Sequence, residues 1–83
     1  KINKGSWDIP PIFDYLQRLG EIDEMEMYRV FNMGIGMVMI VPEKQREEIL
    51  QRLTALGEQA SVIGVVEKRD EGQPSVVIGT EAV

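Results

Sequence analysis

The chain has 83 residues, which is enough for one small domain or a part of one. Fourteen acidic against nine basic side chains give a net charge of −5 at pH 7, which disfavours binding to nucleic acid phosphates. There is no cysteine and no histidine, so disulfides, thiol catalysis, the usual zinc sites and imidazole acid–base chemistry are excluded. The longest clean apolar run, residues 37–41, is far shorter than the roughly 20 residues that span a bilayer. We therefore expect neither a nucleic acid partner nor a membrane partner.

The first predicted helix begins at Pro11 and is ended by Gly20. Pro11 suits the first helical position, because its φ is already helical and that position needs no N–H donor. Ile12, Leu16 and Leu19 follow at spacings of four and three, which places them on one face of a helix. Gly20 is expected at the left-handed position that ends the helix.

The second predicted helix begins after Asp23. This residue can cap the helix, and Glu26 three residues later can complete a capping box. The helix is expected to end at Gly34 and Gly36, where the chain enters the apolar run of residues 37–41. That run predicts a strand buried on both faces.

The rest of the chain predicts one helix and two strands. The helix covers residues 43–56, with Glu48 and Arg52 spaced to pair across one turn. Residues 60–66 and 75–78 predict strands, and the polar residues 69–74 between them predict the loop of a hairpin. The fold class is therefore α+β, with helices on a small mixed sheet in the order α-α-β-α-β-β. Its sheet edges and apolar central strand lack cover, so we expect self-association or a partner within a longer polypeptide.

The only candidate site for chemistry consists of Arg29, Asn32, Gly34 and Gly36. Closely spaced glycines allow left-handed backbone and bring amide groups near an anion. Asn32 can donate to an oxygen atom, and Arg29 offers a guanidinium fork. The alternative is that the two glycines only end a helix and admit a strand. The acidic residues between 21 and 26 suit a helix N-terminus better than a magnesium site, so no metal site is predicted.

Two motifs resemble the aminoimidazole ribonucleotide synthetase family, also called phosphoribosylformylglycinamidine cyclo-ligases. Residues 5–13 read GSWDIPPIF and resemble the loop and helix start of those enzymes. Residues 26–37 read EMYRVFNMGIGM and resemble their glycine-rich signature. Residues 57–64 resemble the stretch that follows. The resemblance runs to about Ile78 and identifies residues 1–83 as the C-terminal portion of the family's C-terminal domain.

The resemblance implies an ATP-dependent ligase of purine biosynthesis. Such an enzyme converts formylglycinamidine ribonucleotide and ATP to aminoimidazole ribonucleotide, ADP and phosphate. ATP and Mg²⁺ are expected in the full-length cytoplasmic homodimer, whose ATP-binding N-terminal domain lies outside this chain. The 83 residues are expected to bind no cofactor and to be inactive alone. Their implied partners are the remainder of the enzyme and a small ribonucleotide. Catalytic residues cannot be assigned, and Arg29, Asn32, Gly34 and Gly36 are candidates for the substrate or phosphate region.

A different class of protein also fits the residues. The acidic charge, the short length and the lack of catalytic side chains suit a stand-alone interaction or regulatory module. Such a module would have a ferredoxin-like half-sheet and would dimerise through an exposed strand edge.

Overall fold

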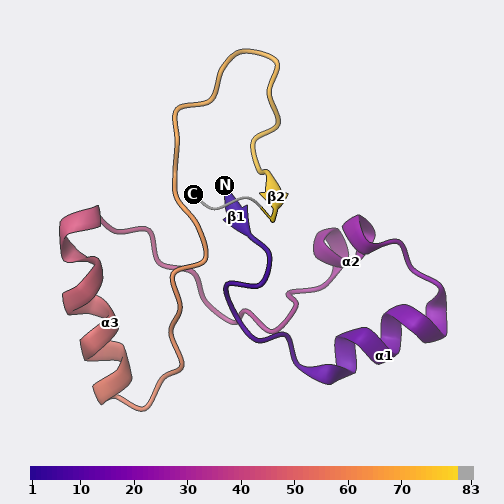
Figure 1. Ribbon diagram of the computed structural model, residues 1–83, viewed down its shortest axis with the longest axis horizontal. Helices are drawn as coiled ribbons and strands as arrows, with labels where there is room; N and C mark the ends of the chain where they lie inside the picture. Colours follow the sequence, from indigo (N-terminus) through magenta and orange to yellow (C-terminus); the bar gives the residue numbers. More distant parts are fainter. Residues whose placement is uncertain (81–83) are drawn as a thin grey trace. The chain divides into compact units, whose positions relative to one another are not determined.

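The computed structural model describes residues 1–80, shown in Figure 1. These residues form two compact units, one of residues 8–39 and one of residues 1–7 with the chain from residue 40 onward. The elements in chain order are β1 (Ile2–Asn3), α1 (Pro11–Gly20), α2 (Glu24–Val30), the 3-10 turn η1 (Glu43–Gln45), α3 (Arg46–Ala55) and β2 (Ile78–Gly79). The α+β class is confirmed, but the predicted order α-α-β-α-β-β is wrong.

The unit of residues 8–39 is a pair of helices. The rings of Phe13 in α1 and Phe31 after α2 meet edge to face, with centroids 6.0 Å apart and planes at 62°. Such a contact contributes about 1 kcal/mol beyond the area that it buries. Met27 is fully buried and Met33 is 7% exposed, and these two side chains are the buried apolar core of residues 1–80. The core of this unit is therefore small and built on flexible methionine side chains.

The predicted start of α1 is confirmed, with Pro11 at its first position. Its predicted end is displaced by one residue. Gly20 still belongs to the helix, and Glu21 takes the left-handed conformation, with φ 50° and ψ 48°. The N–H groups of Glu21 and Ile22 donate to the carbonyls of Arg18 and Gln17, so two of the last four carbonyls of the helix are satisfied by residues beyond Gly20.

The unit that contains the termini holds a small sheet. β1 pairs with β2 in parallel, Ile2 opposite Ile78 and Asn3 opposite Gly79. On its other side, Ile2 forms an antiparallel bridge with Gly64. The first residues of the chain therefore lie between two segments that are far away in sequence.

The predicted hairpin of residues 60–66 and 75–78 is wrong in its pairing. A turn forms where expected, because Gln73 N–H donates to the Asp70 carbonyl at 3.1 Å. Within residues 1–80, however, no backbone hydrogen bond joins the two arms to each other. Each arm pairs with β1 instead, through Asn3 N–H to the Ile63 carbonyl and Ile2 N–H to the Val77 carbonyl, both at 2.8 Å.

The predicted buried strand at residues 37–41 is also wrong. These residues form no strand, and Met37, Val38, Met39 and Ile40 are between 53% and 83% exposed. A strand needs a neighbour to accept and donate its backbone hydrogen bonds, and no segment of residues 1–80 pairs with this one. The third predicted helix is present as η1 and α3, and Arg52 Nη2 lies 2.9 Å from Glu48 Oε1 as expected.

Candidate functional site

The candidate site is a tight turn of residues 32–35 that follows α2. The Asn32 carbonyl accepts from Ile35 N–H at 2.9 Å. Both central residues are left-handed, Met33 at φ 53° and Gly34 at φ 94°. Positive φ at both central positions is characteristic of a type I′ turn. α2 ends at Val30, so Gly34 and Gly36 lie beyond the helix rather than at its end.

The Asn32 side chain holds this turn together. Its Oδ1 accepts from Gly34 N–H at 2.9 Å, which is a local side-chain-to-backbone bond typical of asparagine in turns. Asn32 is exposed, and its Nδ2 group makes no hydrogen bond within residues 1–80. The amide therefore keeps two donors for an oxygen acceptor outside the chain.

Gly34 is held against another segment of the same unit. A Cβ atom added to it would lie 2.4 Å from Pro10 Cδ, far inside van der Waals contact. Gly36 differs, because a Cβ atom there would meet nothing within 4 Å and its φ is not positive. The expectation that both glycines supply left-handed backbone therefore holds for Gly34 alone.

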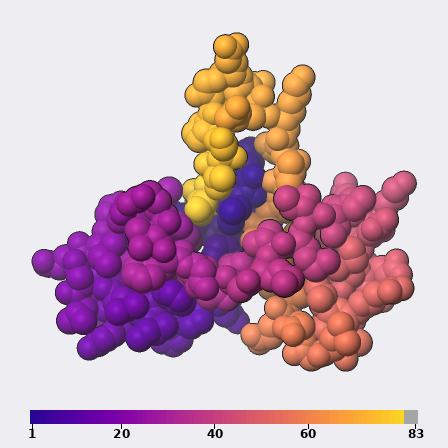
Figure 2. All heavy atoms as spheres, turned by 180° about the vertical axis from the view of Figure 1, so that it is seen from behind, coloured from indigo at the N-terminus to yellow at the C-terminus, as the bar shows by residue number. Residues whose placement is uncertain are grey.

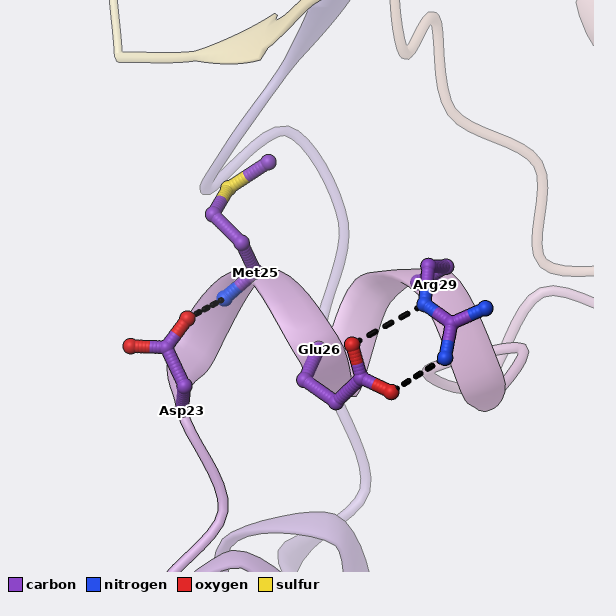
Figure 3. A network of polar contacts seen from close by, with 4 residues as sticks. All are labelled: Asp23, Met25, Glu26 and Arg29. Carbon is purple, nitrogen blue, oxygen red and sulfur yellow. Dashed lines mark hydrogen bonds and ion pairs between the residues drawn. The ribbon is translucent and has the colours of Figure 1, made fainter.

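Arg29 is engaged within α2, as Figure 3 shows. Its Nε donates to Glu26 Oε2 at 2.9 Å, and its Nη2 bonds to Glu26 Oε1. The hydrogen bond from Arg29 holds the pKa of the Glu26 carboxyl below its ordinary value, and the same bond raises the pKa of Arg29. The guanidinium fork predicted for a ligand is bound to a neighbouring carboxylate in this structure.

The predicted capping box is wrong for the same reason. Asp23 does cap α2, since its Oδ2 accepts from Met25 N–H at 3.2 Å. Glu26 turns toward Arg29, and both of its oxygens are bonded there. The ion pair with a residue three positions on offers two charge-assisted bonds, whereas the box would offer one bond to an amide.

The structure thus joins two of the four candidate residues directly. Asn32 and Gly34 are hydrogen-bonded across the turn, Gly36 lies just after it, and Arg29 faces Glu26. The sequence interpretation did not include Pro10, which packs against Gly34, or the left-handed Met33. An asparagine two residues before a glycine is a turn signal that pointed to residues 32–34, but nothing local indicates Pro10.

Residues 1–80 contain no group of three or more carboxylates close enough together to hold a metal ion. Over the same residues, no helix combines the length and the apolar character needed to cross a membrane.

Comparison with known proteins identifies the class. Residues 4–77 match the model of the family described as "AIR synthase related protein, C-terminal domain". The chain therefore belongs to this family, and the resemblance carried by residues 5–13 and 26–37 is confirmed.

Three of the similar relatives bear the same enzyme name. The chain is 58% identical over 76 residues to the phosphoribosylformylglycinamidine cyclo-ligase of Syntrophus aciditrophicus (strain SB). It is 56% identical over 75 residues to the enzyme of that name from Citrifermentans bemidjiense, and 53% over 78 residues to that from Caldanaerobacter subterraneus subsp. tengcongensis. These matches cover 90 to 94% of this chain but only 22% of each relative. No solved structure matches the chain significantly.

Proposed function

We propose that this chain is the C-terminal part of a phosphoribosylformylglycinamidine cyclo-ligase. In that role it takes part in the ATP-dependent closure of the imidazole ring of aminoimidazole ribonucleotide. The observation that carries the proposal is the identity of 53 to 58% along nearly the whole chain to enzymes of that name. The chain spans about a fifth of their length, so the complete reaction needs residues that these 83 do not contain.

We divide the proposed roles between this chain and the remainder of the enzyme by the groups that residues 1–80 contain. They hold no group of carboxylates suited to a metal, and the sequence has no glycine-rich phosphate loop with its lysine. We assign ATP and Mg²⁺ to the remainder of the enzyme, which acts as a cytoplasmic homodimer. The 83 residues form part of the wall around the ribonucleotide and are inactive alone.

The turn of residues 32–35 is the proposed point of contact with the ribonucleotide or its phosphate. Asn32 supports this role because it is exposed and its Oδ1 is used inside the turn, while its Nδ2 donors make no hydrogen bond within residues 1–80. Gly36 supports it because no side chain blocks the backbone there. Arg29 contributes only if it exchanges Glu26 for the ligand, since its fork already bonds that carboxylate.

A chimeric enzyme, called the joined polypeptide below, tests the proposal. The segment of the Syntrophus aciditrophicus enzyme that matches this chain is replaced by the chain itself, and aminoimidazole ribonucleotide formation is assayed with ATP and Mg²⁺. We expect turnover by the joined polypeptide and none by the isolated 83 residues. A folded joined polypeptide without ring-closing activity would contradict the proposed function.

Asn32→Asp then tests the turn. Aspartate still accepts from Gly34 N–H, but it lacks the two amide donors and adds a charge that repels phosphate. We expect kcat/KM of the joined polypeptide to fall at least about tenfold, since a hydrogen bond to a charged group contributes about 1.5–3 kcal/mol. Gln59→Glu makes the same change of charge at an exposed position outside the turn and is the matched control. Unchanged kinetics for Asn32→Asp with an unchanged melting temperature would remove the turn from the substrate region.

A further inference from the structure

The ring of Pro10 lies against the backbone of the turn of residues 32–35. A Cβ atom added to Gly34 would lie 3.1 Å from Pro10 Cγ and closer still to Pro10 Cδ, and the next nearest atom is the Asp8 carbonyl oxygen at 3.7 Å. All three residues belong to the unit of residues 8–39, the purple-to-magenta part of Figure 2. Pro10 and Gly34 are both exposed, so the contact is at the surface and its removal opens no cavity in the core.

The backbone of Pro10 is fixed from both sides. Its φ is −55° and its ψ is 142°. The ring of Pro10 itself restricts φ, and the ring of Pro11 keeps the preceding residue extended. The Pro10 carbonyl also accepts from Phe13 N–H at 3.1 Å. Pro10 therefore presents a rigid ring to the turn.

The start of α1 holds the chain on both sides of Asn32. Before Asn32, the ring of Phe31 meets the ring of Phe13, with centroids 6.0 Å apart. After Asn32, Met33 is 7% exposed and Gly34 lies against the proline ring. With its neighbours held on both sides, Asn32 stays on the exposed side of the turn.

We propose that Pro10 is a positioning residue for the proposed ribonucleotide site. Its ring holds the turn of residues 32–35 in the conformation that keeps the Asn32 amide donors available to an oxygen of the ribonucleotide. Pro10 has no polar side-chain atom, so it acts through Gly34 and the turn rather than on the ligand. The inference rests on the proposed function, which supplies the ligand.

A matched pair of variants of the joined polypeptide tests the inference. Pro10→Ala removes the ring and keeps the extended backbone, because Pro11 still follows. Pro42→Ala is the control. Pro42 is also exposed and precedes a helical turn, with φ −60° and ψ 142°, and its carbonyl likewise accepts from the N–H three residues on, that of Gln45.

Amide hydrogen exchange reports on the turn itself. The N–H groups of Gly34 and Ile35 donate to the Asn32 side chain and carbonyl. Pro10→Ala is expected to speed exchange of these two amides at least about fivefold, because the turn opens more often without the ring. Pro42→Ala is expected to leave their exchange unchanged. Unchanged exchange in Pro10→Ala would overturn the inference.

The two Michaelis constants report on the ligand. Pro10→Ala is expected to raise KM for the ribonucleotide at least about fivefold, because the donors of Asn32 are no longer held in place. KM for ATP should not change, since ATP is assigned to the remainder of the enzyme. Pro42→Ala should change neither constant. A merely structural role for Pro10 would lower the melting temperature and leave both constants as they are.

A double variant tests whether Pro10 acts through Asn32. Asn32→Asp lacks the amide donors, so adding Pro10→Ala to it should lower kcat/KM for the ribonucleotide no further. Two effects that multiply would overturn the inference, because Pro10 would then act by another route.

The same measurements separate this inference from the proposed function. An active enzyme in which Pro10→Ala speeds exchange of the turn without raising KM for the ribonucleotide overturns the inference and leaves the function standing. An inactive joined polypeptide overturns the proposed function and, with it, the role of Pro10 in ligand binding.

Discussion

Two physical requirements coincide at Gly34. Its φ of 94° lies in the left-handed region that side chains other than glycine rarely adopt. Its Cα also faces the Pro10 ring, which would lie 2.4 Å from an added Cβ atom. Met33 beside it is left-handed as well, at φ 53°, and its burial helps to hold that conformation in place.

Gly34→Ala is therefore expected to lower the free energy of unfolding by about 2 kcal/mol, from backbone strain and the contact with Pro10. Gly36→Ala is the matched control, since it has open space and an ordinary φ, and its effect should stay within about 1 kcal/mol. Urea denaturation followed by circular dichroism measures both. Equal stabilities of the two variants would contradict the turn geometry.

The Glu26–Arg29 pair predicts a pH effect of known sign. The hydrogen bond from Arg29 lowers the pKa of Glu26 in the folded chain. A lowered pKa favours folding above the ordinary carboxyl range, and this contribution is lost as the pH falls through the folded pKa. Because both side chains are exposed, solvent and salt screen the pair and its contribution is small.

Arg29→Gln should raise the pKa of Glu26 toward its ordinary value, which a titration followed by NMR at the Glu26 carboxyl carbon would show. Arg18→Gln is the control, because Arg18 pairs with Asp14 at 2.9 Å and not with Glu26. A Glu26 titration that does not change in Arg29→Gln would mean that the pair does not persist in solution.

At the scale of elements, β1 organises the unit that contains the termini. Its two residues connect the segments around Gly64 and Ile78, which do not pair with each other within residues 1–80. Gly64 permits this arrangement, because an added Cβ atom would lie 1.9 Å from the Lys1 carbonyl oxygen. The glycine is needed for close approach of two backbones rather than for its φ.

Gly64→Ala should therefore separate β1 from residues 63–65 and break the bonds Asn3 N–H to Ile63 and Val65 N–H to Lys1. With about 1 kcal/mol for each bond, the expected loss of stability is about 2 kcal/mol. Faster amide exchange at Asn3 and Val65 would show it. Gly79→Ala, with open space in β2, should leave both amides protected. Similar exchange in the two variants would contradict this arrangement.

The accuracy of the predicted helices and strands depended on how far apart in sequence their interacting residues are. The helices α1 and α3 were predicted closely, because a proline at the first position, apolar spacing and ion pairs within one turn all act locally. The strands were not, because residues 37–41 have strand composition but no pairing neighbour. Conversely, residues 2–3 carry little strand signal and still pair on both sides.

At the scale of the whole molecule, more large apolar side chains are exposed than buried. Within residues 1–80, Met27 and Met33 are the only buried apolar residues, while many large apolar side chains are exposed. Both buried residues belong to the unit of residues 8–39. A small domain with so little core has a thin stability margin, which agrees with a chain that spans 22% of its relatives.

The left-handed backbone after α2 was predicted from the closely spaced glycines Gly34 and Gly36, and it is present at Gly34. The hydrogen bond from Gly34 N–H to Asn32 Oδ1 was not predicted, although asparagine commonly bonds to a backbone amide two residues on. The sequence could not separate Gly34 from Gly36, since only the fold places Pro10 beside one of them. The sequence also suggested that Arg29 binds a ligand. In the structure, the Arg29 guanidinium bonds to Glu26 of the same helix.

The sequence by itself determined the α+β class, the positions of α1 and α3, the start of α2, the left-handed backbone after it and the family. All of these depend on residues that are close together in the chain or on motifs that can be compared directly. Only the tertiary structure decided which segments pair with β1, which glycines allow a close approach of another segment and which apolar side chains stay exposed. Those outcomes depend on contacts between residues far apart in sequence. The local composition of a segment does not indicate which distant segment it will contact.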